Sequence, residues 1–397
     1  MNTLKDVNKV YKAQNPSTYV SKVNAKIIKE ITDKKITFLV ETLKLPPKIF
    51  ENSELLDLGC GTGQNTIQYD QLGAKCTLVD YDKNSVLRAR SLFKTYAKNK
   101  FNIINNDLFK FKTNKKFDIV VSNGVAHHTS DNIKNIKLAL KFLKKGGFFI
   151  LGHGETNGFF QRNLQRYILY SLSSNVDEII KISKLLFSEN LNRGRKFGGR
   201  SIKEIIYDTY INPKIDTLSF DQIKNLFKKN NLYLYSSDEK DIDLTAIHGF
   251  KSFFWRFKEK RKFQEKDFLI NALINFSYKE SPKIIDKNSK VLKKISKIQN
   301  NISQKLNDQS AQKFKKLNLI KNLKDYEKEI KNLEKNDIID KKNILKFVYE
   351  IKKILEILQE SNKENKINKL KNILKKNQRL FRGHNGKGMN FFVGMKL

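Results

Sequence analysis

Apolar and polar residues alternate along the first half of this chain in the manner of repeating strand–helix units. Short apolar runs are separated by longer stretches in which apolar residues recur every three or four positions. The runs predict strands buried on both faces, at 55–57, 76–80, 101–104, 117–124, 143–151 and, farther on, 232–235. The stretches between the first five predict helices, so the order implies right-handed crossovers and a parallel sheet.

Helical spacing also marks segments on either side of this core. The segment 17–43 predicts a helix before the first strand, with Ser17 as its N-cap and a Pro-Pro pair beyond its end. Its apolar face holds Val20, Val23, Ile27 and Ile31. A later helix is predicted over 219–230, with Ser219 as its N-cap.

The end of the chain decides how the second half is organised. Residues 390–397 form a short apolar run after a glycine-rich stretch, as a last strand would. We therefore expect 237–382 to be an insertion before that strand, with 1–236 and 383–397 forming the main α/β domain. The insertion has neither proline nor glycine between Lys283 and Gly383, which suits long helices packed as an antiparallel hairpin, a coiled coil or a short bundle.

The net charge of +37 suggests an anionic partner such as nucleic acid or a membrane surface. Only 11 of the 78 basic residues are arginine, however, and asparagine and isoleucine are abundant, as AT-rich coding dictates. The charge is also spread over the whole chain. A nucleic-acid partner therefore stays open but is not favoured. The stretch 250–263 mixes aromatic and basic residues, which fits either an interfacial helix on anionic lipid or rings packed on the sheet domain.

The two cysteines, Cys60 and Cys76, offer neither a disulfide framework nor a metal cluster. No apolar run reaches the roughly 18 residues that span a bilayer, and the first ten residues lack a signal-peptide core. We therefore expect a soluble cytoplasmic protein without a transmembrane segment and without a metal site. The sequence leaves the oligomeric state open.

Residues 55–66 contain the most informative motif. Asp57 leads from a short strand into Gly59, Gly61 and Gly63, and a helix-like segment follows. Glycine lets the backbone approach a bound nucleoside closely because it has no Cβ. Asp80 ends the next strand 17 residues after the last of these glycines, where nucleotide-binding folds place an acid that holds ribose hydroxyls.

This series of motifs resembles the class I S-adenosylmethionine-dependent methyltransferases, whose first motif is Asp/Glu-x-Gly-x-Gly-x-Gly. The resemblance covers about 50–155 closely and implies a Rossmann-like, seven-stranded sheet closed by an antiparallel last strand. It implies S-adenosylmethionine as cofactor, with Asp80 on the ribose, Tyr81 on the adenine face, Asp107 on the adenine amino group and Leu108 against the ring. The cofactor-binding residues that it indicates are Asp57, Gly59, Cys60, Gly61, Gly63, Asp80, Tyr81, Asn106, Asp107, Leu108, Asn123 and Gly124.

The segment 121–131 is similar to a Gly-Val-Leu-His-His-Thr-x-Asp stretch common in methyltransferases that act on small molecules. It lacks the Asn/Asp-Pro-Pro-Tyr motif of enzymes that methylate adenine or glutamine nitrogen. His127 and His128 follow the fourth strand, so either imidazole is a candidate general base. The alternative is that both merely shape the loop.

The segment 159–215 predicts a helical lid over the substrate. Five of the 11 arginines lie in it within 39 residues, at Arg162, Arg166, Arg193, Arg195 and Arg200. Arginine suits carboxylate or phosphate, so we expect either an anionic substrate or a set of surface ion pairs. Asp208, between two tyrosines, is a further candidate base. His153 and Glu155, before the lid, either line the substrate cavity or belong to a flexible loop.

Together these features predict a methyltransferase that acts on an oxygen, nitrogen or carbon atom of a small metabolite. Two alternatives remain. One is an RNA methyltransferase whose basic helical insertion binds phosphates. The other is a chain whose cofactor domain has lost activity and whose helices bind a protein.

Overall fold

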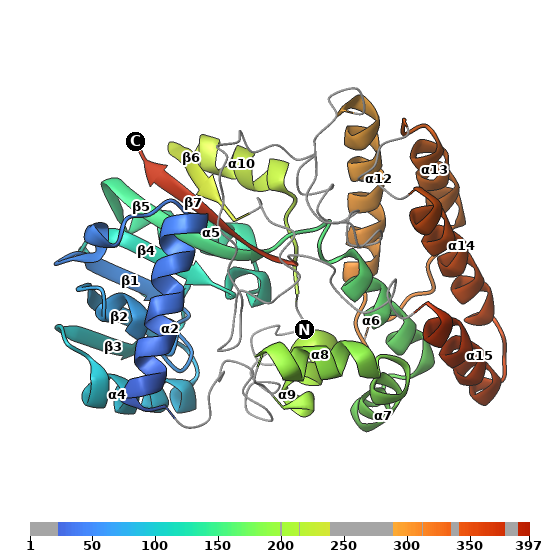
Figure 1. Cartoon of the computed structure of the whole chain (residues 1–397), viewed down its shortest axis with the longest axis horizontal. Helices are drawn as coiled ribbons and strands as arrows, with labels where there is room; N and C mark the ends of the chain where they lie inside the picture. Colours follow the sequence, from blue (N-terminus) through green and yellow to red (C-terminus); the bar gives the residue numbers. More distant parts are fainter. Residues whose placement is uncertain are drawn as a thin grey trace.

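A seven-stranded mixed sheet occupies one end of the molecule (Figure 1). The structure is a computed structural model that describes residues 23–198, 201–213, 215–238, 289–311, 313–334, 341–377 and 388–397. The strands are β1 (Glu54–Leu58), β2 (Lys75–Asp80), β3 (Phe101–Asn105), β4 (Phe117–Asn123), β5 (Leu143–Gly154), β6 (Leu232–Ser237) and β7 (Met389–Lys396). Their order is β3-β2-β1-β4-β5-β7-β6, and β7 runs antiparallel to both neighbours while the other pairs are parallel. This arrangement confirms the predicted fold class.

Helices cover both faces of the sheet and extend beyond its edge. They are α2 (Ala25–Thr37), α3 (Ile67–Asp70), α4 (Lys83–Tyr96), α5 (Asn132–Lys141), α6 (Phe160–Leu172), α7 (Val176–Leu186), α8 (Ser188–Gly198), α9 (Ile202–Ile206), α10 (Phe220–Lys229), α12 (Ser289–Asn307), α13 (Ile320–Lys331), α14 (Lys341–Ile357) and α15 (Lys363–Lys376). Tighter or wider turns lie at η1 (Phe38–Thr42), η2 (Pro47–Phe50), η3 (Ala126–His128) and η4 (Tyr207–Ile211). No helix in these ranges is long and apolar enough to span a bilayer.

Alternate residues of each central strand enter two separate cores, because successive strand side chains point to opposite faces. Leu55 and Leu78 pack with α2, η1 and α4 in one core, whereas Leu56 and Val79 pack with α5 and α10 in the other. Both faces of the strands are therefore buried. This explains why these strands appear in the sequence as unbroken apolar runs rather than as alternating patterns.

From β1 the next strands along the chain, β2 and β3, are added on one side, whereas β4 and β5 are added on the other. The boundary between β1 and β4 is therefore the switch point of the sheet. In open α/β sheets, ligands bind outside the carboxyl ends of the strands at such a point. The glycine turn after β1 and the histidine segment after β4 both lie there, so the topology brings the two main motifs of the sequence to one edge.

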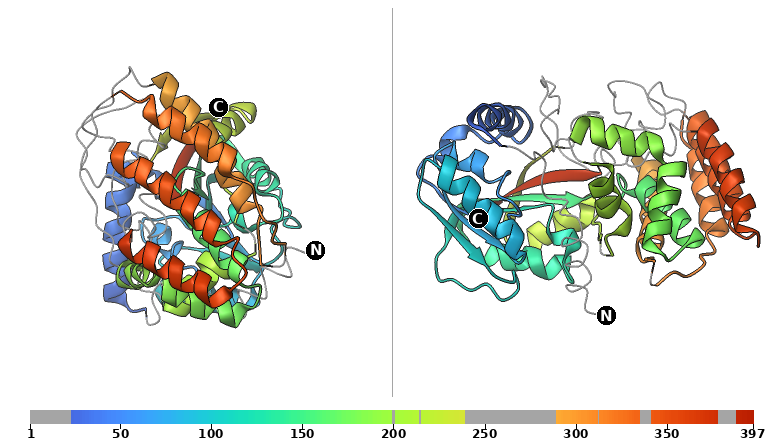
Figure 2. Two further views of the ribbon diagram at one scale, coloured as in Figure 1. Left: turned by 90° about the vertical axis from the view of Figure 1, so that its right-hand side faces the viewer. Right: turned by 90° about the horizontal axis from the view of Figure 1, so that it is seen from below.

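Helices α6–α9 and α12–α15 share one hydrophobic core beside the sheet. Figures 1 and 2 show α13–α15 at the end of the molecule farthest from β1–β3, with α12 and α6–α9 between them and the sheet. Residues expected on the apolar faces of the insertion, such as Leu323, Ile330 and Val348, are buried in that core. The helical part of the insertion is thus packed directly on the segment 159–215. The domain boundaries themselves stay a prediction.

Three local expectations need correction or lie outside the described residues. The helix expected over 17–43 does not run continuously from Ser17, because Asn24 is extended and caps α2 through a bond from Ile27 N to its side chain. Ser17 itself lies outside the described residues, as does the stretch 250–263. The helix-like segment after the glycine turn is a single helical turn, α3. In contrast, α10 starts as expected after Ser219, which forms a capping box with Gln222.

Candidate active site

The glycine turn after β1 folds over the end of β2. Gly59, Gly61 and Gly63 all have positive φ values, of +87°, +55° and +76°. The amide of Gly59 donates to Val79 O over 2.7 Å, and that of Gly61 donates to Asp80 Oδ2 over 2.8 Å. The turn is therefore pinned to β2, in a backbone conformation that residues with a Cβ rarely adopt.

Two of these glycines also touch neighbouring elements closely. A Cβ on Gly59 would lie 2.4 and 2.5 Å from the two methyl carbons of Val125, beyond the end of β4. A Cβ on Gly63 would lie 3.2 Å from atoms of Ala89 and Phe93 on α4. Glycine at 59 thus lets the turn approach the segment that carries the histidines.

The carboxylate of Asp80 organises the end of β2. Its Oδ2 accepts from Gly61 N, and its Oδ1 accepts from Asp82 N over 2.9 Å. Burial raises the pKa of this carboxyl, although the backbone bonds from Asp82 and Gly61 oppose the rise. Each carboxylate oxygen can accept more than one hydrogen bond. Asp80 therefore keeps acceptor capacity for a pair of hydroxyls such as those of a ribose.

The neighbouring segment after β3 reaches the same edge. Asn106 N donates to Asp80 O over 3.0 Å, which ties this segment to the end of β2. Asp107 Oδ1 accepts from Phe109 N over 2.9 Å, and Leu108 is buried beside α5. Tyr81 keeps 43% of its surface exposed. The structure thus brings Asp80, Tyr81, Asn106 and Asp107 together, as the resemblance implies.

At the end of β4, Asn123 and Gly124 face β5. Gly124 has φ +74°, its amide donates to Gly152 O, and a Cβ there would meet nothing within 4 Å. A Cβ on Gly152 would lie 2.4 Å from Asn123 Oδ1. Glycine at 152 is therefore what lets Asn123 lie across the end of β5.

Asp57 is buried beneath the glycine turn and forms part of its support. It accepts a hydrogen bond from the Thr66 hydroxyl. Burial raises its pKa to about 6, partly offset by the Thr66 bond and by the charge of Lys35. Burial also lowers the pKa of Lys35 to about 8, and its ammonium lies 4.6 Å from the ring centre of Tyr69. Sequence reasoning missed Lys35, because on α2 it appears as an ordinary polar helix position.

Cys60 is also buried in the turn, with its thiol 3.6 Å from Gly61 O. Burial, and then the charges of Asp80 and Asp57, raise the pKa of this thiol well above its usual range. The thiolate is therefore disfavoured, so Cys60 contributes shape rather than a nucleophile. No group of three or more histidine, cysteine, aspartate or glutamate side chains suited to a metal ion occurs within the described ranges.

Three imidazoles gather at the carboxyl ends of β4 and β5. The ring centres of His127 and His128 are 4.1 Å apart, and that of His153 is 5.5 Å from His127. His153 is fully buried and its Nδ1 lies 2.9 Å from Gly154 O. Burial lowers its pKa to about 4, so this imidazole is neutral at pH 7. Sequence reasoning had placed His153 at this edge without linking it to the other two.

The histidine segment meets the turn η4 from a distant part of the chain. His128 Nε2 lies 4.0 Å from Asp208 Oδ1, and Asn212 Nδ2 lies 3.2 Å from His128 Nδ1. Because an amide NH2 only donates, the Nδ1 of His128 accepts and its Nε2 carries the proton toward Asp208. Two candidate bases that the sequence offered as alternatives are thus neighbours. Sequence reasoning missed Asn212, since nothing local relates it to His128.

The loop between β5 and α6 is held by Glu155 rather than left flexible. Glu155 is buried, and its two oxygens accept from Asn157 Nδ2 over 3.1 Å and from Gly158 N over 3.0 Å. Gln299 of α12 donates to Asn157 Oδ1 over 3.2 Å. These hydrogen bonds favour an ordered loop over the flexible one of the two alternatives, and α12 of the insertion takes part in holding it.

The arginines of 159–215 divide into two kinds. Arg162 Nη2 donates to Asp208 O over 2.8 Å and lies 3.8 Å from Asp208 Oδ2. Arg166 Nη2 donates to Asn212 O over 3.0 Å. Both are buried, so these two are not the surface ion pairs of the alternative interpretation, whereas Arg195 is exposed. Arg200 lies outside the described residues.

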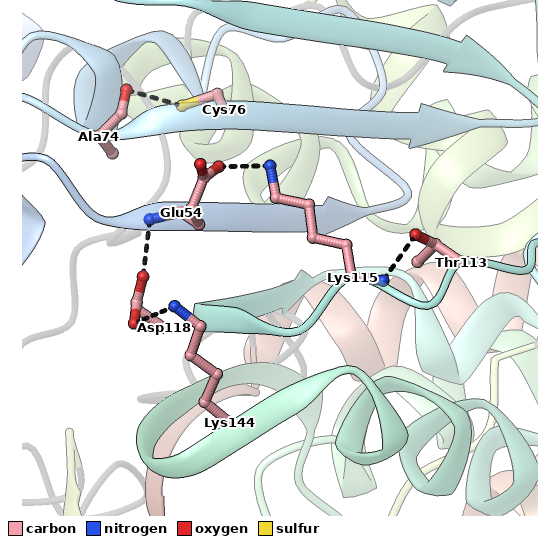
Figure 3. Close-up of polar contacts among 7 residues, drawn as sticks. All are labelled: Glu54, Ala74, Cys76, Thr113, Lys115, Asp118 and Lys144. Carbon is pink, nitrogen blue, oxygen red and sulfur yellow. Dashed lines mark hydrogen bonds and ion pairs between the residues drawn. The ribbon is translucent and has the colours of Figure 1, made fainter.

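The opposite edge of the sheet has a purely structural set of charges (Figure 3). Asp118 accepts from Glu54 N over 2.9 Å and from Lys144 Nζ over 2.8 Å. Although burial raises its pKa, the Lys144 bond and the backbone bond outweigh that effect and hold the pKa of Asp118 below its ordinary value. Lys115 pairs with Glu54 Oε2 over 2.8 Å. These carboxylates are engaged in joining β1, β4 and β5 rather than facing the carboxyl edge.

Comparison with known proteins agrees with this geometry. Residues 56–151 match a family model described as a methyltransferase domain. The chain is 30% identical over 105 residues to a ubiquinone biosynthesis O-methyltransferase of Pelagibacter ubique, which covers 26% of this chain and 43% of that protein. It is 37% identical over 118 residues to a ribosomal protein L11 methyltransferase of Thermosipho melanesiensis, which covers 29% and 43%.

Among solved structures, the magnesium protoporphyrin IX methyltransferase of Synechocystis PCC 6803 aligns at 15% identity with a TM-score of 0.33, over 59% of this chain and 85% of that one. The chain spans less than half the length of the two curated relatives that it matches. With its motif order and its strand order, the chain contains a methyltransferase domain of the class I S-adenosylmethionine-dependent family.

Proposed function

We propose that this chain is a methyltransferase that transfers a methyl group from S-adenosylmethionine to an oxygen, nitrogen or carbon atom of a small metabolite. The observation that carries the proposal is the meeting of two groups at one sheet edge. The glycine turn held by Asp80 lies against Val125, and His128, which lies 4.0 Å from Asp208, follows Val125 three residues later.

The residues at this edge fit the cofactor. Asp80 has acceptor capacity for the ribose hydroxyls, and Asp107 for the adenine amino group, with Leu108 and Tyr81 on either side of the base. The remaining contacts in the proposal come from the turn and from the end of β4, namely Asp57, Gly59, Cys60, Gly61, Gly63, Asn106, Asn123 and Gly124. When bound, the cofactor supplies an electrophilic sulfonium methyl group.

The protein side of the reaction is positioning and proton removal. The ends of helices and strands hold the acceptor atom in line with the methyl group, and this proximity lowers the barrier to transfer. His128 is the favoured base: its Nδ1, which accepts from Asn212 in this structure, takes the proton in place of that hydrogen bond, and the carboxylate of Asp208 beside Nε2–H stabilises the imidazolium that forms. The other candidates for the same proton are Asp208 and His127, whose ring packs against that of His128.

A small-metabolite acceptor is supported by how deeply this pair lies. The side chains of His128 and Asp208 are largely covered, beneath the buried helix α6. The names of the curated relatives point to two kinds of acceptor, a quinone precursor and a ribosomal protein, so they leave the choice open. In the insertion, Lys331 and Lys352 pair with Glu327, and Lys363 with Glu178. These pairs reduce the cationic surface that the RNA alternative requires.

Calorimetry with S-adenosylmethionine and S-adenosylhomocysteine tests the cofactor site. We expect Asp80→Asn to weaken binding by about 10- to 100-fold, since a charge-assisted hydrogen bond contributes about 1.5–3 kcal/mol. Asp118→Asn, the same change at the opposite edge, should leave the affinity unchanged. Absence of binding by the wild-type protein at millimolar concentration would refute the proposal.

Transfer of tritium from labelled S-adenosylmethionine tests the acceptor. Label should enter a small-molecule pool rather than total RNA or protein. Label in RNA, with an affinity that falls steeply with salt through counterion release, would favour the RNA alternative instead.

A further inference from the structure

Helix α6 is buried along almost its whole length although it contains many polar residues. The buried polar side chains are Gln161, Arg162, Asn163, Gln165 and Arg166. Positions three and four apart share a helix face, so four of these, at 161, 162, 165 and 166, form one stripe. The apolar residues Phe160 and Leu164 instead enter the core shared with α12–α15. Arg162, Gln165 and Arg166 contact η4 or the residue that follows it, so this side of α6 faces η4.

Two side chains of the stripe lack part of their hydrogen bonding. Arg166 is 2% exposed, and its Nη1 has no hydrogen-bond partner in the described part of the chain. Gln161 is 3% exposed, and both atoms of its amide are likewise without a partner among those residues. Buried polar groups of native proteins are normally paired, so unpaired ones need an explanation.

The two arginines of the stripe differ in whether a carboxylate balances their charge. Arg162 lies 3.8 Å from the carboxylate of Asp208, which balances its charge. Arg166 has only a carbonyl, Asn212 O, and the ring of Tyr170, 5.4 Å from its guanidinium carbon. No carboxylate within the described ranges lies at ion-pair distance from Arg166. A buried cation without a counter-charge is costly, which an anionic ligand would relieve.

The stripe lies directly behind the proposed base. Arg166 donates to Asn212 O, and the side chain of Asn212 contacts His128 Nδ1. Arg162 reaches Asp208, which lies beside His128 Nε2. Each arginine thus connects through one residue of the η4 region to the same imidazole.

We propose that the methyl acceptor carries a carboxylate or phosphate group that Arg166 and Gln161 bind, a statement that rests on the methyltransferase function proposed above. The guanidinium Nη1–H and the Gln161 amide N–H donate to the anion, and the Gln161 carbonyl accepts from a neighbouring hydroxyl or protonated oxygen. This arrangement places the acid end of the acceptor on α6 and its reacting atom near His128. The sequence had assigned anion binding to the group of arginines as a whole, whereas the structure points to Arg166.

Titration of inorganic phosphate and of acetate, at constant ionic strength and with saturating S-adenosylhomocysteine, tests this site. The wild-type protein should bind one of them at a single saturable site. Arg166→Gln should weaken that binding at least 10-fold, while Arg195→Gln, which removes an exposed arginine of α8, should not change it. Gln161→Leu should weaken it several-fold and serves if Arg166→Gln does not fold.

Several outcomes would overturn the inference. One is equal binding by the wild type, Arg166→Gln and Gln161→Leu; another is an equal loss in Arg195→Gln. A third is a preferred acceptor from the tritium screen that has no acid group. Binding of S-adenosylhomocysteine, measured on each variant, separates the two proposals: retained cofactor binding without anion binding rejects only this one, whereas a wild type that binds no cofactor rejects the methyltransferase function.

Discussion

Substitution of Gly59 by alanine tests whether the glycine turn owes its shape to a missing Cβ. Two separate costs are expected. The first is conformational, because Gly59 has φ +87°, and a residue with a Cβ in this region is disfavoured by about 1–2 kcal/mol. The second is steric, because the new carbon would lie 2.4 and 2.5 Å from the methyl carbons of Val125, well inside contact distance.

The steric cost is estimated from overpacked cores, in which extra carbons typically destabilise by about 1–3 kcal/mol. Valine is stiff at χ1, so Val125 cannot simply rotate away. The sum predicts a loss of about 2–5 kcal/mol in the free energy of unfolding. Since the displaced turn carries the amide that binds Asp80, affinity for S-adenosylhomocysteine should fall as well.

Gly146 provides the matched control. It has φ +76° in the turn within β5, and a Cβ there would meet nothing within 4 Å. Gly146→Ala should therefore show the conformational cost alone, about 1–2 kcal/mol. Adding Val125→Ala to Gly59→Ala should recover most of the difference between the two glycine variants.

Urea unfolding followed by circular dichroism, with calorimetry for the cofactor product, measures these effects. Equal destabilisation by Gly59→Ala and Gly146→Ala would refute the close approach of the turn to Val125. The close approach would also be refuted if adding Val125→Ala to Gly59→Ala restored no stability. If Gly59→Ala is destabilised but keeps normal cofactor affinity, the shape of the turn is not needed for cofactor binding.

Further predictions concern buried charges, the base and the insertion. Burial raises the pKa of Asp57 from 3.8 to about 6, so its buried charge destabilises the fold fully above pH 6 and not below pH 3.8. Between pH 3.5 and 7 the stability of Asp57→Asn should therefore rise by up to about 3 kcal/mol relative to that of the wild type, and a pH-independent difference would contradict this. His153 should stay neutral down to about pH 5 in nitrogen-15 NMR spectra. His128→Asn should lower kcat by about 100-fold or more with cofactor affinity kept, if it is the base. Gln299→Leu and Tyr326→Phe should each destabilise by about 1–3 kcal/mol, but less than additively together, because Tyr326 donates to Gln299.

The strands of the sheet were predictable because strands buried on both faces consist of continuous apolar runs. All of the expected strands are present within a few residues. β5 is the main exception in length, since it continues three residues beyond the expected end at Leu151. The extension pairs His153 with Asn390 and Gly154 with Met389 of β7. Those partners follow some 240 residues later, so local pattern gives no sign of them.

Helix ends were less predictable where polar side chains compete for the backbone. Apolar spacing continues through Val20 and Val23, yet the side chain of Asn24 accepts from Ile27 N and starts α2 there. Asparagine at such a position favours a cap over a helix interior. After the glycine turn, Thr66 donates to Asp57 and α3 is reduced to one turn.

Sequence could bring together the residues proposed to bind the cofactor, whereas it could not identify the partners of the proposed base. Asp80, Asp107 and the glycines follow their strands at fixed short intervals, so the parallel topology alone assembles them. The partners of His128 come from Asp208 and Asn212, about 80 residues later and across helices whose packing has no motif. Lys35 beneath Asp57 was hidden for the same reason.

The shared core of α6–α9 and α12–α15 gives the insertion a definite relation to the proposed chemistry. One face of α6 is apolar and packs on the insertion, while its polar stripe faces η4 and, through Asn212, His128. A polar connection runs in parallel, from Tyr326 through Gln299 to Asn157 in the loop that follows His153. Both routes end at the acceptor side, and the cofactor edge is built by the sheet and its own helices. In the proposed function, the insertion would therefore affect the acceptor rather than the cofactor, so changes at Gln299 should alter the KM for the acceptor before they alter cofactor affinity.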